Sequence, residues 1–181
     1  MPGEEGVWLF IFGDMLFFAV FFVTFNYYRA HDVALYTRSQ LQLNQALGLA
    51  NTLILLTSSW CVVQSLRAFR SERIATSKYL LAGAGVLGMA FIVSKAIEWS
   101  DKFRHGITVE TNEFFMFYFM FTGIHLIHVI IGLGVLAYLY RTVGARSSHA
   151  ARLVTLEGGA AFWHLVDMLW VVLFALLYLM R

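Results

Sequence analysis

The chain has 181 residues, of which 60% are hydrophobic and 13% charged, and its formal net charge is +2. A soluble domain carries about twice this share of charged residues, so the composition excludes an ordinary soluble protein, and we expect no nucleic-acid partner. The chain contains one cysteine, Cys61, which excludes an internal disulfide and any metal centre built from several thiolates.

Five apolar runs account for most of the chain, and each is long enough to cross a membrane as a helix, which takes roughly 20 apolar residues. The stretches between them are too short for a soluble domain. The sequence therefore predicts an all-α, polytopic membrane protein in which residues 1–181 form one domain, a bundle of five transmembrane helices. The expected spans are about 7–28, 43–66, 79–97, 114–140 and 160–180.

The N-terminus and the loops predict the orientation. The opening residues, MPGEEG, are acidic where a signal peptide is basic, so we expect the first span to remain in the mature protein. Seven lysines and arginines flank the spans on the side of the N-terminus, and five on the other side. Positive residues favour the cytoplasmic face, so we expect a cytoplasmic N-terminus and a C-terminus on the outer side. Residues 30–42 are polar and predict an exposed link.

The second span carries polar residues at every seventh position. Asn44, Asn51, Ser58 and Ser65 lie on one face of a helix, with Gly48 beside them. In lipid, such a stripe lets helices approach closely and hydrogen bond to one another. A packing seam is the simpler interpretation, and a polar pore wall is the alternative. The third span has three glycines that suggest the same packing role: Gly83, Gly85 and Gly88.

Ionisable residues inside the first and third spans indicate candidate functional sites, because such groups are costly in lipid. Asp14 lies in the first span, where the apolar residues outweigh the roughly 2.5–3.5 kcal/mol that a central Asp costs on insertion. We therefore expect its side chain to face other helices. Lys95 and Glu98 are three residues apart near the end of the third span, so they share a helix face and are expected to form an interfacial ion pair.

The last two spans carry further ionisable side chains. His125 and His128 lie near the middle of the fourth span. His164 and Asp167 are three residues apart in the fifth, and Glu157 lies two turns before His164 on a similar face. At a rise of ~1.5 Å per residue, the polar groups of three spans, including the aspartate of the first, fall in one layer on the cytoplasmic side of the membrane centre.

That polar layer has three interpretations. In the first, its members satisfy one another as a hydrogen-bonded network. In the second, they relay protons, as histidines do near neutral pH. A metal site is the third interpretation, with zinc or iron held by His125, His128, His164 and a carboxylate. The last two interpretations make the chain a small proton-conducting transporter or a membrane metalloprotein. The absence of an internal repeat argues against a transporter.

Five stretches, taken together and in this order, resemble subunit III of haem–copper terminal oxidases (the cytochrome c oxidase subunit III family). The five-span length and the acidic opening are most similar to the NorE-like branch, which is encoded with nitric oxide reductases. The matching stretches are GVWLFIFGDMLFF, NTLILLTSSW, AIEWSDKF, GIHLIHVIIG and FWHLVDMLWVVLF.

The resemblance implies a non-catalytic accessory subunit that binds no haem, metal or other cofactor. It implies packing against the catalytic subunit I of a haem–copper oxidase or the large subunit of a nitric oxide reductase. A location in the bacterial inner (cytoplasmic) membrane, with the outer C-terminus in the periplasm, is also expected. Structural phospholipid, support of assembly and stability, and support of proton uptake in respiratory electron transport are further expectations. The two additional N-terminal spans of the long family members are absent from this chain.

The resemblance also assigns residues. Asp14 matches the buried carboxylate of the first shared span, which is usually a Glu. The region that holds lipid phosphates is matched by His128 and by the basic fourth loop, with Arg141, Arg146 and His149. The polar motif that closes the family pattern is matched by Glu157, His164 and Asp167.

Overall fold

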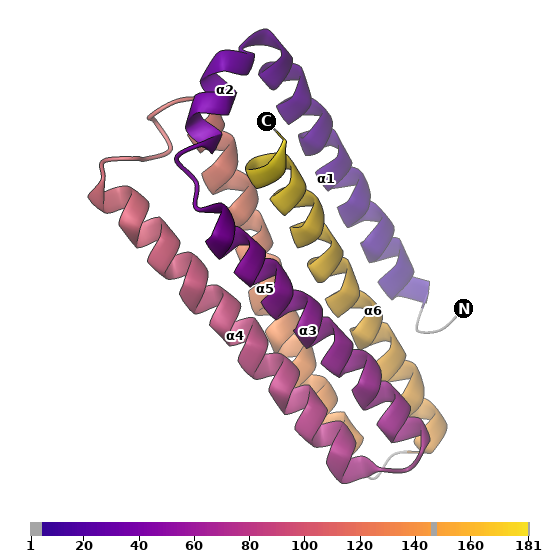
Figure 1. Cartoon of the computed structure of the whole chain (residues 1–181). Coiled ribbons are helices and arrows are strands. Elements are labelled where there is room, and N and C mark those ends of the chain that lie inside the picture. Colours follow the sequence, from indigo (N-terminus) through magenta and orange to yellow (C-terminus); the bar gives the residue numbers. More distant parts are fainter. Residues whose placement is uncertain (1–4, 146–147, 181) are drawn as a thin grey trace.

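The computed structural model describes residues 5–145 and 148–180, in which all regular structure is helical (Figure 1). This confirms the predicted all-α bundle of five apolar helices, each long enough to cross a membrane. The helices are α1 (Glu5–His31), α3 (Gln45–Arg70), α4 (Ile74–Arg104), α5 (Glu113–Val143) and α6 (His149–Phe174), which continues into a π-helical turn, η1 (Ala175–Leu179). Both α4 and α5 have 31 residues, about 46 Å at a rise of 1.5 Å per residue, so they extend beyond a hydrocarbon core of about 30 Å.

Polar residues in the short loops define where the helices begin. Asn44, Asn112 and Ser148 cap the N-termini of α3, α5 and α6, and each side chain accepts a hydrogen bond of 2.9–3.3 Å from the backbone N–H three residues ahead. Such caps satisfy donors that have no partner within the helix. Asn44 therefore belongs to the helix start, although its spacing places it in the polar stripe of the second span.

Helices α3 to α6 form an up-and-down four-helix bundle, and α1 packs against its outside (Figure 1). Helix α6 lies at the centre, in contact with α3, α5 and α1, and 61% of its most apolar segment is buried. The corresponding value for α1 is 17%. The large aromatic side chains of α1 make most of its contact with α5, as where Phe25 meets Phe117 and Phe121 with ring centroids 5.7 and 5.9 Å apart.

The centre of the bundle is organised around Trp163 of α6. A Cβ atom on Gly88 of α4 would come within 2.9 Å of this indole, and one on Gly132 of α5 within 2.7 Å. The indole Nε1 donates a hydrogen bond of 3.2 Å to the hydroxyl of Ser58 on α3. Glycine at two positions therefore allows three helices to close around one large side chain.

The polar stripe of α3 faces α4, as a packing seam requires. The hydroxyl of Ser58 donates to the carbonyl of Ala84 at 2.9 Å, and that of Ser65 to the carbonyl of Ser77 at 3.0 Å. Asn51 is fully buried in the same seam. The glycines of α4 divide by position: Gly88 is in close contact, whereas no atom lies within 4 Å of a Cβ on Gly83 or Gly85.

The link predicted for residues 30–42 is instead a short helix, α2 (Val33–Gln40), capped by Asp32. Its apolar side is folded onto the bundle, where Tyr36 packs against Phe25 and Phe114 with ring centroids 5.4 and 5.7 Å away. The prediction of an exposed link was wrong because a polar average conceals a short amphipathic pattern. Burial, with a smaller contribution from the nearby Glu113 carboxylate, raises the pKa of Tyr36 to about 12.

Candidate functional site

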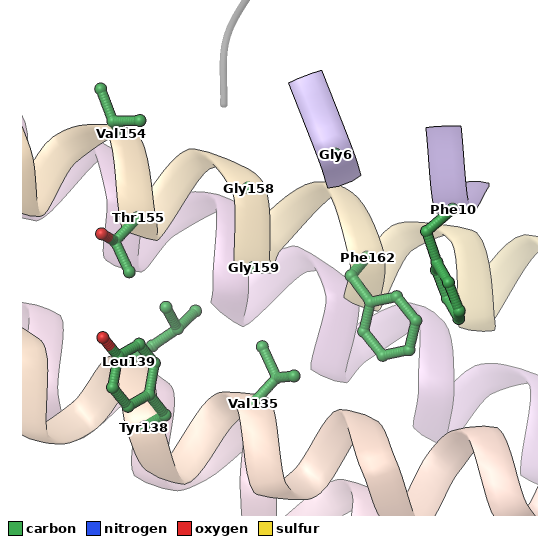
Figure 2. A pocket seen from close by; sticks show the side chains of 10 residues that line it. All are labelled: Gly6, Phe10, Val135, Tyr138, Leu139, Val154, Thr155, Gly158, Gly159 and Phe162. Carbon is green, nitrogen blue, oxygen red and sulfur yellow. The ribbon is translucent and has the colours of Figure 1, made fainter. Parts of the chain in front are cut away.

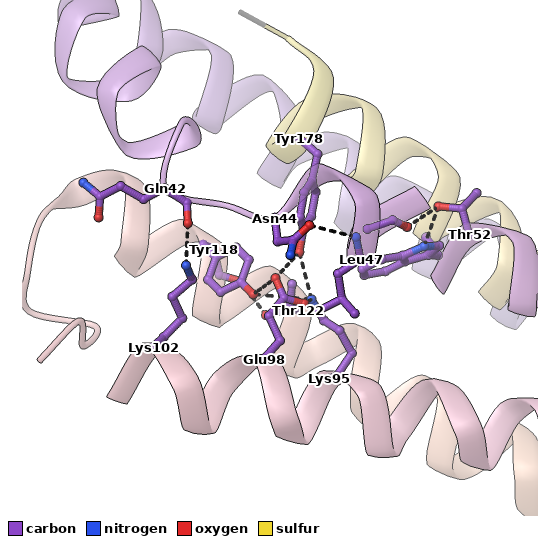
Figure 3. A network of polar contacts seen from close by, with 12 residues as sticks. Gln42, Asn44, Leu47, Thr52, Lys95, Glu98, Lys102, Tyr118, Thr122 and Tyr178 are labelled. Carbon is purple, nitrogen blue, oxygen red and sulfur yellow. Dashed lines mark hydrogen bonds and ion pairs between the residues drawn. The ribbon is translucent and has the colours of Figure 1, made fainter. Parts of the chain in front are cut away.

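The most extensive polar cluster surrounds Lys95 and Glu98 on α4 (Figure 3). The Lys95 ammonium lies 2.7 Å from Glu98 Oε2, and the hydroxyls of Tyr118 and Tyr178 donate to Glu98 Oε1 at 2.8 and 2.6 Å. The ammonium also lies 4.9 Å from the ring centroid of Trp170, a cation–π distance. The two charges therefore have partners on three helices, and we call this group the Lys95–Glu98 cluster.

Lys95 and Glu98 thus pair as their spacing suggested, and the pair is buried within the bundle. Only 2% of the Lys95 side chain and 4% of the Glu98 side chain are exposed, because η1 and α5 cover them. Side chains from the first half of the chain hold η1 in place: Gln40 donates to the carbonyl of Leu176 at 3.0 Å, and Gln45 to that of Tyr178 at 2.6 Å. Sequence reasoning missed both tyrosines, since nothing distinguishes them from the other aromatic residues of their spans.

Asp14 of α1 pairs with His128 of α5, where Asp14 Oδ1 lies 3.0 Å from His128 Nε2. The other ring nitrogen, Nδ1, lies 2.8 Å from the carbonyl of Ile124. A carbonyl only accepts, so Nδ1 carries a hydrogen. The hydrogen bond at Nε2 then has two forms, an imidazolium donating to a carboxylate or a protonated Asp14 donating to a neutral ring. One proton is therefore shared between α1 and α5.

His125 lies apart from that pair although it is one turn away. Its ring is fully buried, and neither nitrogen has a hydrogen-bond partner within residues 5–145 and 148–180. The neighbours are aromatic: the ring centroids of Phe91 and Trp170 lie 5.6 and 5.3 Å away. Residues three apart on a helix point in directions that differ by about 60°. This difference is enough for His128 to face α1 while His125 faces the four-helix core.

The hydroxyl of Ser59 links His164 and Asp167, which both lie on α6. Ser59 Oγ of α3 is 2.5 Å from His164 Nδ1, and the same hydroxyl also interacts with the Asp167 carboxyl. Glu157 is not part of this group. Its carboxylate pairs with Arg70 at the end of α3, 2.6 Å away, and so connects two helix ends instead.

The structure therefore divides the expected polar layer into separate places. Asp14 forms a pair with His128. His164 and Asp167 both contact Ser59, and His125 has no hydrogen-bond partner among the described residues. A metal site would need three or more of the candidate ligands around one point, and within the described parts of the chain no three His, Cys, Asp or Glu side chains are so gathered. Contacts with different helices separate them, because Asp14 and His128 meet between α1 and α5, whereas His164 and Asp167 face α3.

The basic region between α5 and α6 lies beside two surface hollows. The larger, of about 460 Å³, is apolar and lies between α1, α5 and α6, with Phe10, Leu139 and Phe162 in its wall (Figure 2). The smaller, of about 310 Å³, adjoins it and is lined by Arg141 and Arg152. Tyr138 and Thr155 line both hollows, so the two are continuous.

The candidate headgroup residues differ in their positions. Arg141 lines the smaller hollow, whereas His149 stacks on Phe69, with ring centroids 4.8 Å apart and planes at 7°, and does not line it. Arg152, near the start of α6, also lines the smaller hollow, and its closeness in sequence to the basic loop was the available signal. Arg146 lies outside the described residues.

Five membrane-crossing helices with ion pairs and hydrogen-bonded polar groups between them define an integral membrane protein. Residues 4–181 match the family described as cytochrome c oxidase subunit III. The chain therefore belongs to the cytochrome c oxidase subunit III family, as the resemblance predicted.

Individual relatives agree with this assignment. The chain is similar to cytochrome c oxidase subunit 3 of Alkalihalophilus pseudofirmus, with 30% identity over 183 residues that cover 97% of this chain and 85% of the relative. A probable cytochrome c oxidase subunit 3 of Mycobacterium tuberculosis is 25% identical over 176 residues, covering 97% and 85%. A third relative, heme-copper oxidase subunit I+III of Aeropyrum pernix, is 27% identical over 186 residues, covering 97% of this chain and 22% of the relative.

Proposed function

We propose that the chain is a non-catalytic accessory subunit that packs beside the catalytic, haem-bearing subunit of a respiratory haem–copper oxidase and supports its assembly and stability. The observation that carries this proposal is the family match over residues 4–181. The pairing of Lys95 with Glu98 and of Asp14 with His128 supports it, because these groups hold helices together rather than converge on a reaction centre. The large subunit of a nitric oxide reductase is the alternative partner, as the NorE-like length suggests.

The test is purification from the native membrane. An affinity tag on the chain should retain a haem protein in mild detergent, and the spectrum of the purified material identifies the partner. Oxygen consumption by this material indicates an oxidase, and nitric oxide consumption indicates a reductase. A tagged chain that is folded but retains no haem protein, before and after chemical cross-linking of the membranes, contradicts the proposal.

We also propose that the two hollows between α5, α6 and α1 hold one phospholipid. The larger hollow suits acyl chains because its wall is apolar, and the smaller suits an anionic phosphate because Arg141 and Arg152 line it. Basic pockets between transmembrane helices bind lipid headgroups in this way. The proposed cytoplasmic location of this loop follows from the bias of lysine and arginine.

Lipid analysis of purified variants tests this assignment. Arg141→Gln should lower the amount of co-purified anionic phospholipid per protein, since it removes one charge from the hollow. Arg38→Gln is the matched control, because Arg38 is exposed on α2 at the other end of the molecule. Equal lipid content in the wild type and in both variants contradicts the site. The orientation is tested separately by a periplasm-dependent reporter fused after residue 181, which should be active.

A further inference from the structure

His164 is more exposed than most ionisable residues deep within the transmembrane helices; His128 is half-buried too, but its Nε2 lies 3.0 Å from Asp14 Oδ1. Asp14, Lys95, Glu98 and His125 are buried, as is usual for such groups, which face the bundle interior. His164 is only half-buried, although it lies well inside a helix of the bundle. Its ring therefore reaches the surface that α6 turns toward the membrane.

The hydrogen bonds of Ser59 determine which atom His164 presents there. When Asp167 is ionised, the Ser59 hydroxyl donates to its carboxylate and accepts from His164 Nδ1, which then carries the hydrogen. The neutral ring then has a free lone pair on Nε2. Within residues 5–145 and 148–180, Nε2 has no hydrogen-bond partner. The outer surface of α6 thus displays a hydrogen-bond acceptor.

The surroundings of His164 form a strip that another helix can cover. Ala161, His164, Met168 and Val172 lie on one face of α6 at helical spacing, and we call them the outer strip of α6. Met168 is 68% exposed, and Trp60 of the adjoining helix α3 is 59% exposed. Helix α6 is in contact with α3 on one side and α1 on the other (Figure 1), so the strip lies between two flanking helices.

The outer faces of α4 and α5 need no such partner. The exposed side of α4 carries apolar residues such as Val86, Met89 and Val93, and that of α5 carries Ile127 and Ile130. Acyl chains can cover such side chains without leaving a hydrogen-bonding group unsatisfied. They offer no hydrogen-bond donor to an imidazole nitrogen, and water is absent at this depth. The outer strip of α6 therefore needs a hydrogen-bond donor that a protein partner can supply and lipid cannot.

We propose that the outer strip of α6, with Trp60 beside it, is the docking face for a transmembrane helix of the catalytic subunit, which donates a hydrogen bond to His164 Nε2. The inference rests on the proposed function, since it names the face that meets the partner. A small residue, Ala161, and the flexible Met168 allow close approach of a second helix. The Aeropyrum pernix relative, named as subunit I+III, supports the catalytic subunit as the occupant over a second copy of this chain.

Site-specific photocross-linking in native membranes tests the face. A photoreactive phenylalanine analogue replaces Met168 in one variant and Val93, on the outer side of α4, in the matched control. The Met168 position should give an adduct with the haem-bearing subunit, at least tenfold more abundant than any adduct from Val93. An adduct confined to Val93, an adduct of Met168 with a second copy of this chain, or no protein adduct from Met168 overturns the proposal.

Two substitutions test the hydrogen bond itself. His164→Leu should lower the retention of the haem-bearing subunit in detergent at least tenfold, because it removes the acceptor. His164→Gln, which keeps an acceptor of similar reach, should retain more of it than His164→Leu at an equal melting temperature. Equal retention in both variants and in the wild type overturns the role of His164. If the wild type retains the haem subunit while these tests fail, the docking face alone is refuted; if the wild type retains none, the proposed function fails.

Discussion

The ammonium of Lys95 lies 2.7 Å from the carboxylate of Glu98, one turn away on α4, and both are almost wholly shielded from solvent. Such a pair is stable only while both charges are present and their remaining hydrogen-bonding groups are satisfied. Tyr118 and Tyr178 supply those bonds from α5 and η1. The Lys95–Glu98 cluster thus fastens the C-terminal turn to two other helices.

Removing one charge of this cluster should destabilise the protein more than removing both. Lys95→Met leaves the Glu98 carboxylate buried without its cation, and we expect a loss of about 3–5 kcal/mol in the free energy of unfolding. The double variant Lys95→Met with Glu98→Gln should recover part of that loss, because the amide oxygen still accepts from the tyrosines. Denaturant unfolding in detergent measures all three proteins. A double variant less stable than Lys95→Met would contradict the account.

A methyl group on Gly132 should disturb the packing of Trp163. Because a Cβ there would lie 2.7 Å from the indole, Gly132→Ala requires a shift of α5 or of the ring, and overpacking of this kind costs about 1–3 kcal/mol. Gly134→Ala is the control, since no atom lies within 4 Å of its Cβ position. Melting temperatures should fall for the first variant and not for the second. Equal melting temperatures would show that the indole accommodates the methyl group.

The five helices could be predicted from the sequence because hydropathy over about 20 residues needs no knowledge of tertiary contacts. Helix α2 could not be found in that way, since it is short and only one side of it is apolar. The pairing of Lys95 with Glu98 followed from their spacing on one helix. Its burial did not, because Tyr178 reaches the cluster only through the fold of η1.

Spacing alone was a poorer guide to the histidines. His125 and His128 are neighbours along α5, yet different helices face them, so one is paired with Asp14 and the other has only aromatic neighbours. Glu157 and His164 share a helix face, but Arg70 binds Glu157 near the loop. Contacts between helices determine these partners. Residue spacing along one helix does not reveal which other helices pack against it.

Tyr36 should make stability fall at high pH. Its raised pKa, about 12 against an ordinary value of about 10, means that the unfolded chain loses this proton first. The contribution is therefore fully present below pH 10 and is lost as the pH rises toward 12. Tyr36→Phe removes the ionisable hydroxyl, which has no hydrogen-bond partner in the described structure, so the variant should lose less stability between pH 10 and 12. Melting temperatures across that range compare the two proteins, and parallel curves would exclude Tyr36 as the source.

The Asp14–His128 pair should matter for proton-linked turnover rather than for assembly. Asp14→Asn keeps a side chain of the same size that can still hydrogen bond to His128 Nε2, but it removes the proton that the pair shares. We expect the complex to assemble with an unchanged haem content, while the dependence of turnover on pH changes.

A control carboxylate distinguishes this effect from a general change in charge. Asp101 is exposed near the end of α4, away from the α1–α5 contact, so Asp101→Asn should leave both assembly and the pH profile as they are in the wild type. Loss of the whole complex in Asp14→Asn would show instead that the ion pair is needed to hold α1 on the bundle. An unchanged pH profile in an intact complex would show that the shared proton takes no part in turnover.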